Sequence, residues 1–192
     1  MDTDFGTYHH STPAESMKLR ERAENEFSSL LLTLNERDSS LRILDAGCGL
    51  GFLCYVAARL FPFAMIVGVD VFGHGSLLGS SIERAKENMR KLGIGNRVSF
   101  LQHDLLKPLN QIEKFDVAIS NLVFHNLGSG RFSAYENVFS ALKTGGYFIV
   151  GDLFPHLDAD LEYLERHSVS VQKGGEIASG DWQYVILTLR ME

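Results

Sequence analysis

The sequence has few cysteines, no long apolar run and no dense block of basic residues, and each absence excludes a class of protein. Its 192 residues include two cysteines, Cys48 and Cys54, too few for a disulfide framework and without the spacing of a metal site. No apolar run approaches the roughly 18–20 residues that span a membrane, and residues 1–13 are too polar for a signal peptide. We therefore expect a cytoplasmic protein with reduced cysteines, no bound metal and no membrane contact.

The charge of the chain argues against duplex nucleic acid as a partner. The net charge is -6, and Lys and Arg form no dense cluster. Because neutralisation of phosphates supplies most of the affinity for a duplex, an acidic chain is poorly suited to it. The length and the 45% hydrophobic content predict one soluble globular domain over residues 1–192. Neither quantity specifies an oligomeric state.

Residues 41–52, LRILDAGCGLGF, are the most informative stretch. The pattern predicts an apolar strand that ends in Asp45, a glycine-rich turn, and a helix that begins near Phe52. Glycines in such a turn allow positive φ and let a ligand lie against the main chain, and the start of the helix suits a carboxylate or phosphate. The stretch therefore predicts a nucleotide-type binding loop.

Two details of this loop argue against a dinucleotide. The dinucleotide fingerprint G-x-G-x-x-G requires a third glycine where Phe52 stands. Asp45 would also repel a pyrophosphate, whereas it would suit a ligand with an ammonium or sulfonium group. S-adenosylmethionine has both groups, and a carboxylate for the start of the helix. An NAD-dependent oxidoreductase is therefore the less favoured alternative.

Residues 45–51, DAGCGLG, resemble the first motif of class I S-adenosylmethionine-dependent methyltransferases. The resemblance covers nearly the whole chain after residue 40 and is to the small type, found in archaea and bacteria, without a substrate-domain insertion. It implies an α/β fold: a doubly wound, mostly parallel seven-stranded sheet with an antiparallel last strand and helices on both faces. It also implies S-adenosylmethionine as cofactor.

Acidic residues recur at the ends of three successive predicted strands, at Asp45, Asp70 and Asp104. Three acids on one rim are costly unless a cation or several donors lie among them. Asp70 is placed to accept hydrogen bonds from both ribose hydroxyls. The resemblance implies that Asp104 reaches the adenine amino group, although Asp104 is also suited to cap a helix. The predicted cofactor-binding residues are Asp45, Ala46, Gly47, Cys48, Gly49, Gly51, Asp70, Val71, Asp104, Leu105 and Asn121.

The resemblance places the reaction-side residues after the fourth predicted strand, Phe115–Ser120. Asn121 stands where amino-directed nucleic-acid methyltransferases begin an Asn-Pro-Pro-aromatic motif, but the prolines are absent here. His125 follows one helical turn later and is a candidate general base. A structural histidine bonded to the backbone is the alternative. The predicted catalytic residues are His125 and Asn121, and no metal ligand is predicted.

The ends of the chain carry further expectations. Residues 1–11 form either a disordered tail or a lid over the site, and 12–35 is a helix opened by a capping box at Thr12. Its expected inner face is Met17, Ala23, Phe27, Leu30, Leu31 and Leu34. Ser80 is expected to cap a later helix. Asp152 either lines the substrate side or caps the segment Leu157–Arg166, and the cap is favoured.

These patterns together predict a methyltransferase that transfers a methyl group in line to an oxygen, nitrogen or carbon nucleophile. A small-molecule substrate is the expected acceptor. A non-catalytic partner subunit that binds the cofactor remains an alternative, because the substrate side lacks a decisive catalytic set.

Overall fold

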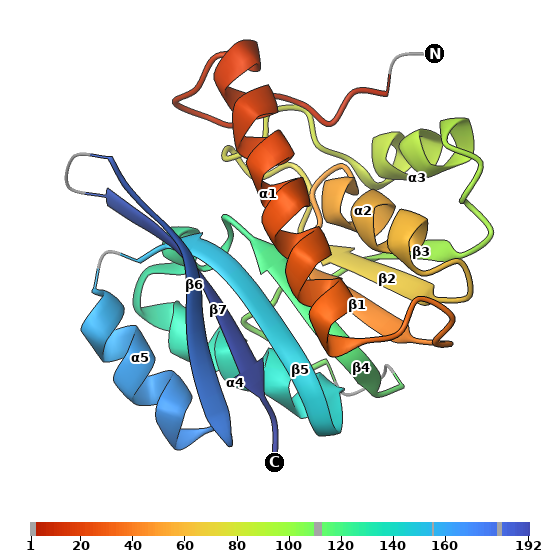
Figure 1. The fold of residues 1–192 in the computed structure, drawn as a ribbon. Coiled ribbons are helices and arrows are strands. Elements are labelled where there is room, and N and C mark those ends of the chain that lie inside the picture. The colour runs from red at the N-terminus through yellow and green to blue at the C-terminus, as the bar shows by residue number, and fades with distance from the viewer. Residues whose placement is uncertain (1–2, 110–112, 155, 180–181) are drawn as a thin grey trace.

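The computed structural model describes residues 3–109, 113–154, 156–179 and 182–192, which form a seven-stranded sheet with helices on both faces (Figure 1). The strands lie in the order β3-β2-β1-β4-β5-β7-β6. Their bounds are β1 Arg42–Ala46, β2 Met65–Asp70, β3 Val98–Gln102, β4 Phe115–Asn121, β5 Leu142–Leu153, β6 Ser170–Ser179 and β7 Trp182–Arg190. The helices are α1 Pro13–Leu34, α2 Phe52–Leu60, α3 Ile82–Lys91, α4 Arg131–Ala141 and α5 Leu157–Arg166, with a 3-10 segment, η1, at Phe124–Gly130.

The topology confirms the predicted fold class. Strands β1 to β5 pair in parallel, and β7 inserts antiparallel between β5 and β6. The chain therefore runs outward from β1 to β3, returns to β4, and places the carboxyl ends of β1 and β4 side by side. In sheets of this kind, ligands bind where the strand order reverses.

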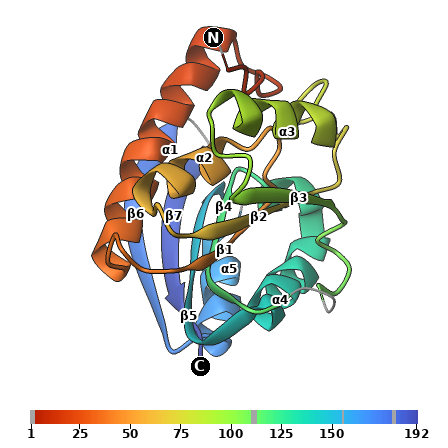
Figure 2. The same cartoon turned by 90° about the vertical axis from the view of Figure 1, so that its right-hand side faces the viewer.

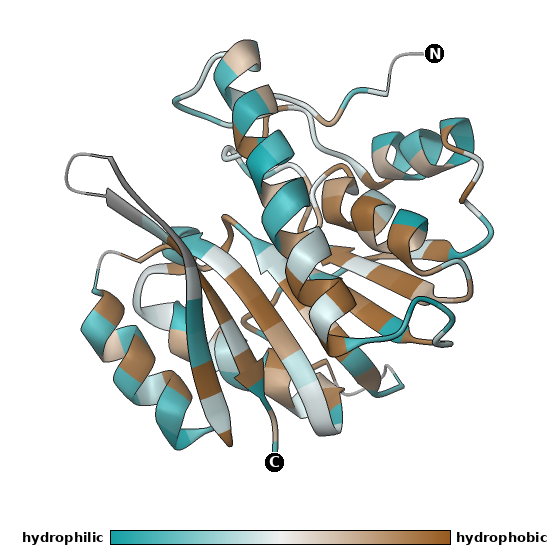
Figure 3. Cartoon of the chain, viewed as in Figure 1, coloured by the Kyte–Doolittle hydropathy of each residue, from teal (hydrophilic) through white to brown (hydrophobic). Residues whose placement is uncertain are grey.

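Helices α1, α2 and α3 cover one face of the sheet, and α4 and α5 cover the other (Figure 2). The two faces have separate hydrophobic cores, one including Phe27 and Phe61 and the other including Phe124 and Phe148. The central strands are buried on both sides. Figure 3 shows these strands mainly in the hydrophobic colour, whereas the outward side of α1 is mainly in the hydrophilic colour. No helix among the described residues is long and apolar enough to cross a membrane.

Helix α1 begins as its sequence predicts. Thr12 Oγ1 accepts from the Glu15 N–H at 3.2 Å, and Glu15 Oε2 accepts from the Thr12 N–H at 2.7 Å, which is the predicted capping box. The predicted inner face is correct for Ala23, Phe27 and Leu31, which are buried, but wrong for Met17, which is 58% exposed. Ser16, seven residues before Ala23, occupies the buried position instead, so Met17 lies one position off the buried stripe.

The cap of α3 is one residue later than expected. Ser81 is the N-cap, and its hydroxyl accepts from the Arg84 N–H at 3.2 Å. Ser80 is buried and accepts from the Gly73 N–H at 3.1 Å, so it closes the glycine-containing loop that precedes the helix.

Candidate active site

A cavity of about 790 Å³ lies at the carboxyl ends of the central strands. It brings together most of the predicted site residues, which arrive from strand ends that a parallel sheet places at one edge. Ala46 and Gly51 do not line it, although both belong to the predicted loop. The predicted residues that do line it are Asp45, Gly47, Cys48, Gly49, Asp70, Val71, Asp104, Leu105, Asn121 and His125.

At two positions in the loop between β1 and α2, only glycine fits both the backbone conformation and the available space. Gly47 has φ 80° and Gly49 has φ 51°, which side chains rarely adopt. A Cβ on Gly47 would lie 2.3 Å from Val123, and one on Gly49 would lie 2.8 Å from Leu77. The bare main chain of this loop therefore faces the cavity, as predicted for a nucleotide-type site.

Asp70 holds the glycine loop in place and retains acceptor capacity. Its Oδ2 accepts from the Gly49 N–H at 2.8 Å, and its Oδ1 accepts from the Phe72 N–H at 2.7 Å. Each carboxylate oxygen has a further lone pair, so Asp70 can accept two more hydrogen bonds at the cavity wall.

Asp45 is almost fully buried, with 1% of its surface exposed. Its Oδ2 accepts from the N–H of Cys54 at 3.0 Å and from the thiol of Cys54 at 3.1 Å, so it caps the first turn of α2. Burial, with a contribution from the charge of Asp70, raises the pKa of Asp45 to about 7 although the Cys54 hydrogen bonds oppose the shift. Asp45 therefore takes one of the N–H groups at the start of α2, where the sequence predicts a ligand carboxylate; that prediction stays a prediction.

Asp104 forms a local turn and caps no helix. Its Oδ1 accepts from the Leu106 N–H at 2.9 Å, and the Lys107 N–H bonds back to the Asp104 carbonyl at 2.9 Å. The alternative of a helix N-cap is therefore wrong. Asp104 lines the cavity beside the buried Leu105, and its predicted contact with adenine stays a prediction.

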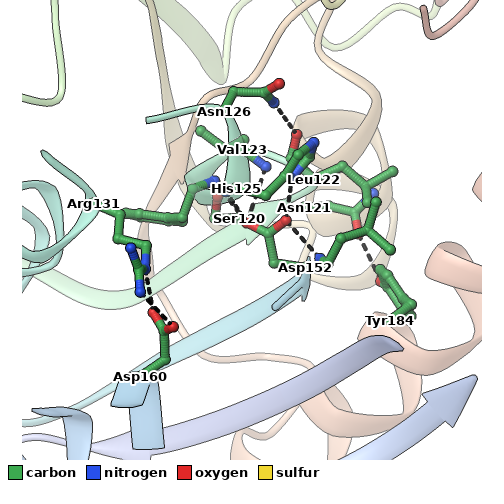
Figure 4. A network of polar contacts seen from close by, with 12 residues as sticks. Ser120, Asn121, Leu122, Val123, His125, Asn126, Arg131, Asp152, Asp160 and Tyr184 are labelled. Atoms are coloured by element: carbon green, nitrogen blue, oxygen red, sulfur yellow. Dashed lines mark hydrogen bonds and ion pairs between the residues drawn. The ribbon is translucent and has the colours of Figure 1, made fainter. Parts of the chain in front are cut away.

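His125 is paired with a carboxylate that the sequence did not assign to it. Its Nδ1 lies 2.5 Å from Oδ1 of Asp152 (Figure 4). Asp152 Oδ2 also accepts from the backbone N–H groups of Val123, Phe124 and His125, at 3.2, 2.6 and 3.3 Å. A carboxylate bound to Nδ1 favours the tautomer with the proton on Nδ1, which leaves the Nε2 lone pair for other chemistry.

The preferred prediction for Asp152 is therefore wrong. Asp152 lies inside β5, and the N-cap of α5 is His156, with no side-chain capping bond. Asp152 instead caps the start of η1 and orients His125. A signal was present in the sequence, because Asp152 follows an apolar run at the same strand edge as Asp45 and Asp70.

Asn121, at the end of β4, is fixed by a residue from the distant strand β7. Its Oδ1 accepts from the Tyr184 hydroxyl at 2.6 Å, as Figure 4 shows. Burial raises the pKa of Tyr184, so its hydroxyl remains protonated and donates. Gly151 makes this contact possible, since a Cβ there would lie 2.3 Å from the Tyr184 oxygen.

The N-terminal arm, defined here as residues 3–11, lies across the cavity. The His9 N–H bonds to the Ser76 carbonyl at 2.9 Å, and Tyr8 and Leu77 form an antiparallel bridge. The Tyr8 ring packs against the Arg20 guanidinium, and Tyr8 lines the cavity together with Asn121. Because Phe5, Tyr8 and residues 9–11 line the cavity, the structure favours the lid over the disordered tail, and closure over a ligand stays a prediction.

The comparisons with known proteins agree with this geometry. Residues 37–186 match the family profile described as a methyltransferase domain. The chain is a class I S-adenosylmethionine-dependent methyltransferase by family.

Individual relatives of this methyltransferase differ widely. It is 31% identical over 147 residues to the arsenite methyltransferase of Mus musculus, covering 72% of this chain and 37% of that protein. It is 29% identical to a ribosomal protein L11 methyltransferase of Deinococcus radiodurans, covering 98% of this chain and 62% of the relative. The structure of magnesium protoporphyrin IX methyltransferase from Synechocystis PCC 6803 with bound cofactor is 17% identical, with a TM-score of 0.70 over 98% of this chain and 88% of that one, which shows the shared fold.

The residues of this methyltransferase fit S-adenosylmethionine, the cofactor of the family. The cavity has the volume of a small-molecule site, the glycine loop offers bare main chain, and Asp70 keeps open acceptors at the wall. The described residues contain no group of three or more His, Cys, Asp or Glu side chains arranged to hold a metal ion.

Residues with an unfavourable backbone conformation also lie at or next to the cavity. The described residues include three non-glycine positions with positive φ, namely His10, Phe72 and Leu122. His10 and Leu122 line the cavity, and Phe72 follows Val71, which also lines it. Strain of this kind persists where the surrounding structure fixes a functional arrangement.

Proposed function

We propose that this protein transfers the methyl group of S-adenosylmethionine to an oxygen, nitrogen or carbon nucleophile of a small molecule, with His125 as general base. The observation that carries the proposal is the His125–Asp152 pair at the wall of the cavity that also contains the glycine loop. The chain spans 37% and 62% of the two curated relatives named above, so its activity is proposed from its own site.

When bound, the cofactor supplies a methyl group already activated on a sulfonium. The protein must therefore hold the nucleophile in line and remove its proton. His125 accepts that proton at Nε2, and Asp152 holds the ring and stabilises the positive charge that then forms. Asn121, fixed by Tyr184, offers an amide beside the base to orient the acceptor.

The lid supports a small acceptor. The arm crosses the cavity, and much of the wall is apolar, including Phe5, Leu19 and Leu127. A mainly apolar cavity beneath the arm suits a small acceptor beside the cofactor.

The resemblance to an arsenite methyltransferase does not carry arsenite over as the acceptor. Both cysteines of the chain are buried. Burial raises the pKa of Cys48 to about 11 and that of Cys54 well above its usual value, so neither supplies a thiolate at neutral pH. The match to a methyltransferase family also leaves the NAD-dependent alternative without support. The oriented histidine–carboxylate pair at the cavity supports a catalytic protein over a non-catalytic subunit.

The test begins with cofactor labelled on its methyl group and a fractionated extract of small molecules. Label recovered on one small molecule identifies the acceptor, whereas label found on macromolecules alone contradicts the small-molecule proposal. With that acceptor, His125→Ala should lower the rate of transfer by about 100-fold or more. His167→Ala, at the exposed end of α5, is the matched control and should keep the full rate. Full activity of His125→Ala contradicts the base.

A further inference from the structure

The structure raises the question of where the carboxylate of the cofactor's methionine portion is bound. The start of α2 is the place that the sequence predicts. Asp45 already accepts from the Cys54 N–H there, so a second carboxylate would meet a like charge in a buried setting. A cation elsewhere on the cavity wall would therefore bind the carboxylate better than the start of α2.

Arg20, on α1, is such a cation. Among the described residues that line the cavity, it is the only Lys or Arg. One of its N–H groups donates to the Phe5 carbonyl at 2.8 Å, and its guanidinium carbon lies 4.5 Å from the centroid of the Tyr8 ring. The guanidinium has five N–H donors, so these contacts orient it and still leave donors for a ligand.

Tyr8 adds a second donor next to Arg20. Its ring packs against the Arg20 guanidinium, and the charges of both Arg20 and Asp45 act on its pKa. Burial raises the pKa of Tyr8, although Arg20 acts in the opposite direction, so the hydroxyl stays protonated. A positive and a negative group thus border the same part of the cavity, as the ammonium and carboxylate of an α-amino acid require.

We propose that Arg20, with the Tyr8 hydroxyl as a second donor, binds the carboxylate of the methionine portion of S-adenosylmethionine. The assignment rests on the cofactor proposed above. An arginine can bind a carboxylate through two parallel N–H···O bonds, which are stronger than bonds between neutral groups. The arm and α1 then belong to the cofactor site, and closure of the lid depends on the ligand that it covers.

The test compares S-adenosylmethionine with decarboxylated S-adenosylmethionine, which lacks only the carboxylate, by calorimetric titration. The unaltered protein should bind the complete cofactor about tenfold or more tightly than the decarboxylated form. Arg20→Gln should remove most of this preference, because it weakens binding of the complete cofactor and changes binding of the decarboxylated form by less than about twofold. Tyr8→Phe should reduce the preference in part.

The control is Arg90→Gln on α3, an exposed arginine that pairs with Glu87 outside the cavity and gives the same change in net charge. It should keep the full preference. Equal binding of the two ligands by the unaltered protein overturns the proposal. Equal weakening of both ligands in Arg20→Gln also overturns it, because Arg20 would then only hold the arm. If neither ligand binds the unaltered protein, the cofactor assignment itself fails.

Discussion

At the scale of single residues, Asp45 combines burial with ionisation near neutral pH. Unfolded, an aspartate ionises near pH ~3.9, whereas in the folded protein the pKa of Asp45 is about 7. Between these values the folded state binds more protons than the unfolded state. The contribution of Asp45 to the free energy of unfolding therefore falls as the pH rises from about 4 to 7 and stays low above that.

This sign gives a prediction for Asp45→Asn. The amide can still accept from the Cys54 N–H but has no charge to bury. In the absence of cofactor, the variant should gain stability relative to the unaltered protein as the pH rises from 4 to 8, by up to about 4 kcal/mol. Urea denaturation of both proteins at several pH values measures the difference. A difference that does not vary with pH contradicts the raised pKa.

Asp70 gives a second prediction at this scale. If its open lone pairs bind the ribose hydroxyls, Asp70→Ala should weaken binding of S-adenosylhomocysteine by about tenfold or more. Loss of the bond to the Gly49 N–H should add to the effect, because that bond fixes the glycine loop. Asp158→Ala, at an exposed position in the first turn of α5, is the control. Unchanged affinity in calorimetry would remove the ribose assignment.

At the scale of elements, the absence of a side chain at Gly151 on β5 leaves room for the contact between Asn121 on β4 and Tyr184 on β7. A methyl group at this position would lie 2.3 Å from the Tyr184 oxygen and 3.0 Å from Oδ1 of Asn121. Gly151→Ala should therefore lower the free energy of unfolding by about 1–3 kcal/mol, as overpacked core substitutions do. Chemical denaturation of Gly151→Ala and of the unaltered protein measures this loss in the free energy of unfolding.

Two further variants separate crowding from a general effect of alanine in a strand. Tyr184→Phe removes the crowded hydroxyl, so Gly151→Ala should cost less in that background. Gly174→Ala, in β6, places its Cβ where no atom lies within 4 Å, and it should change stability by less than about 0.5 kcal/mol. An equal loss in Gly151→Ala and Gly174→Ala would show that packing against Tyr184 is not the cause.

Elements defined by local patterns were predictable from the sequence. The fourth predicted strand, Phe115–Ser120, ends one residue before β4 does, and the capping box at Thr12 begins α1 as expected. In both cases the signal lies within a few consecutive residues, where periodicity and capping act. The doubly wound, mostly parallel sheet with an antiparallel last strand followed from the family resemblance.

The contacts that complete the site were not predictable in the same way. The bond between His125 and Asp152 joins residues 27 positions apart, and the bond between Tyr184 and Asn121 joins residues 63 apart. Each depends on strand register and on a turn that no short motif encodes. Arg20, on α1, lines the cavity and bonds to the Phe5 carbonyl of the arm, a contact 15 residues apart in the sequence that no local pattern shows.

At the scale of the whole molecule, the sheet and the lid differ in how firmly they are held. The sheet is hydrogen-bonded through seven strands and buried between two hydrophobic cores. The arm is held over the cavity by its bridge to Leu77 and the His9–Ser76 bond, and by side-chain contacts. These are the contacts of Arg20 with Phe5 and Tyr8, of Phe5 with Phe52 and Tyr55, and of Asp4 with Arg84 and Asn88. Residues 3–11 are all half-buried or exposed, whereas the central strands are buried, so the arm should open at a lower free energy than the sheet.

Hydrogen exchange should resolve this difference. Without cofactor, the amide of His9 should exchange far faster than the amides of β4, because opening of the arm leaves the sheet intact. Saturation with S-adenosylhomocysteine should slow exchange in the arm and in the facing loop around Ser76, since a ligand bound through Arg20 and Tyr8 stabilises the closed state. In Arg20→Gln this ligand-dependent protection should be lost from the arm, whereas the glycine loop should still be protected at saturating ligand. Arm exchange that is equally slow with and without ligand would mean that the lid is a fixed part of the fold, and the coupling between closure and cofactor binding would be wrong.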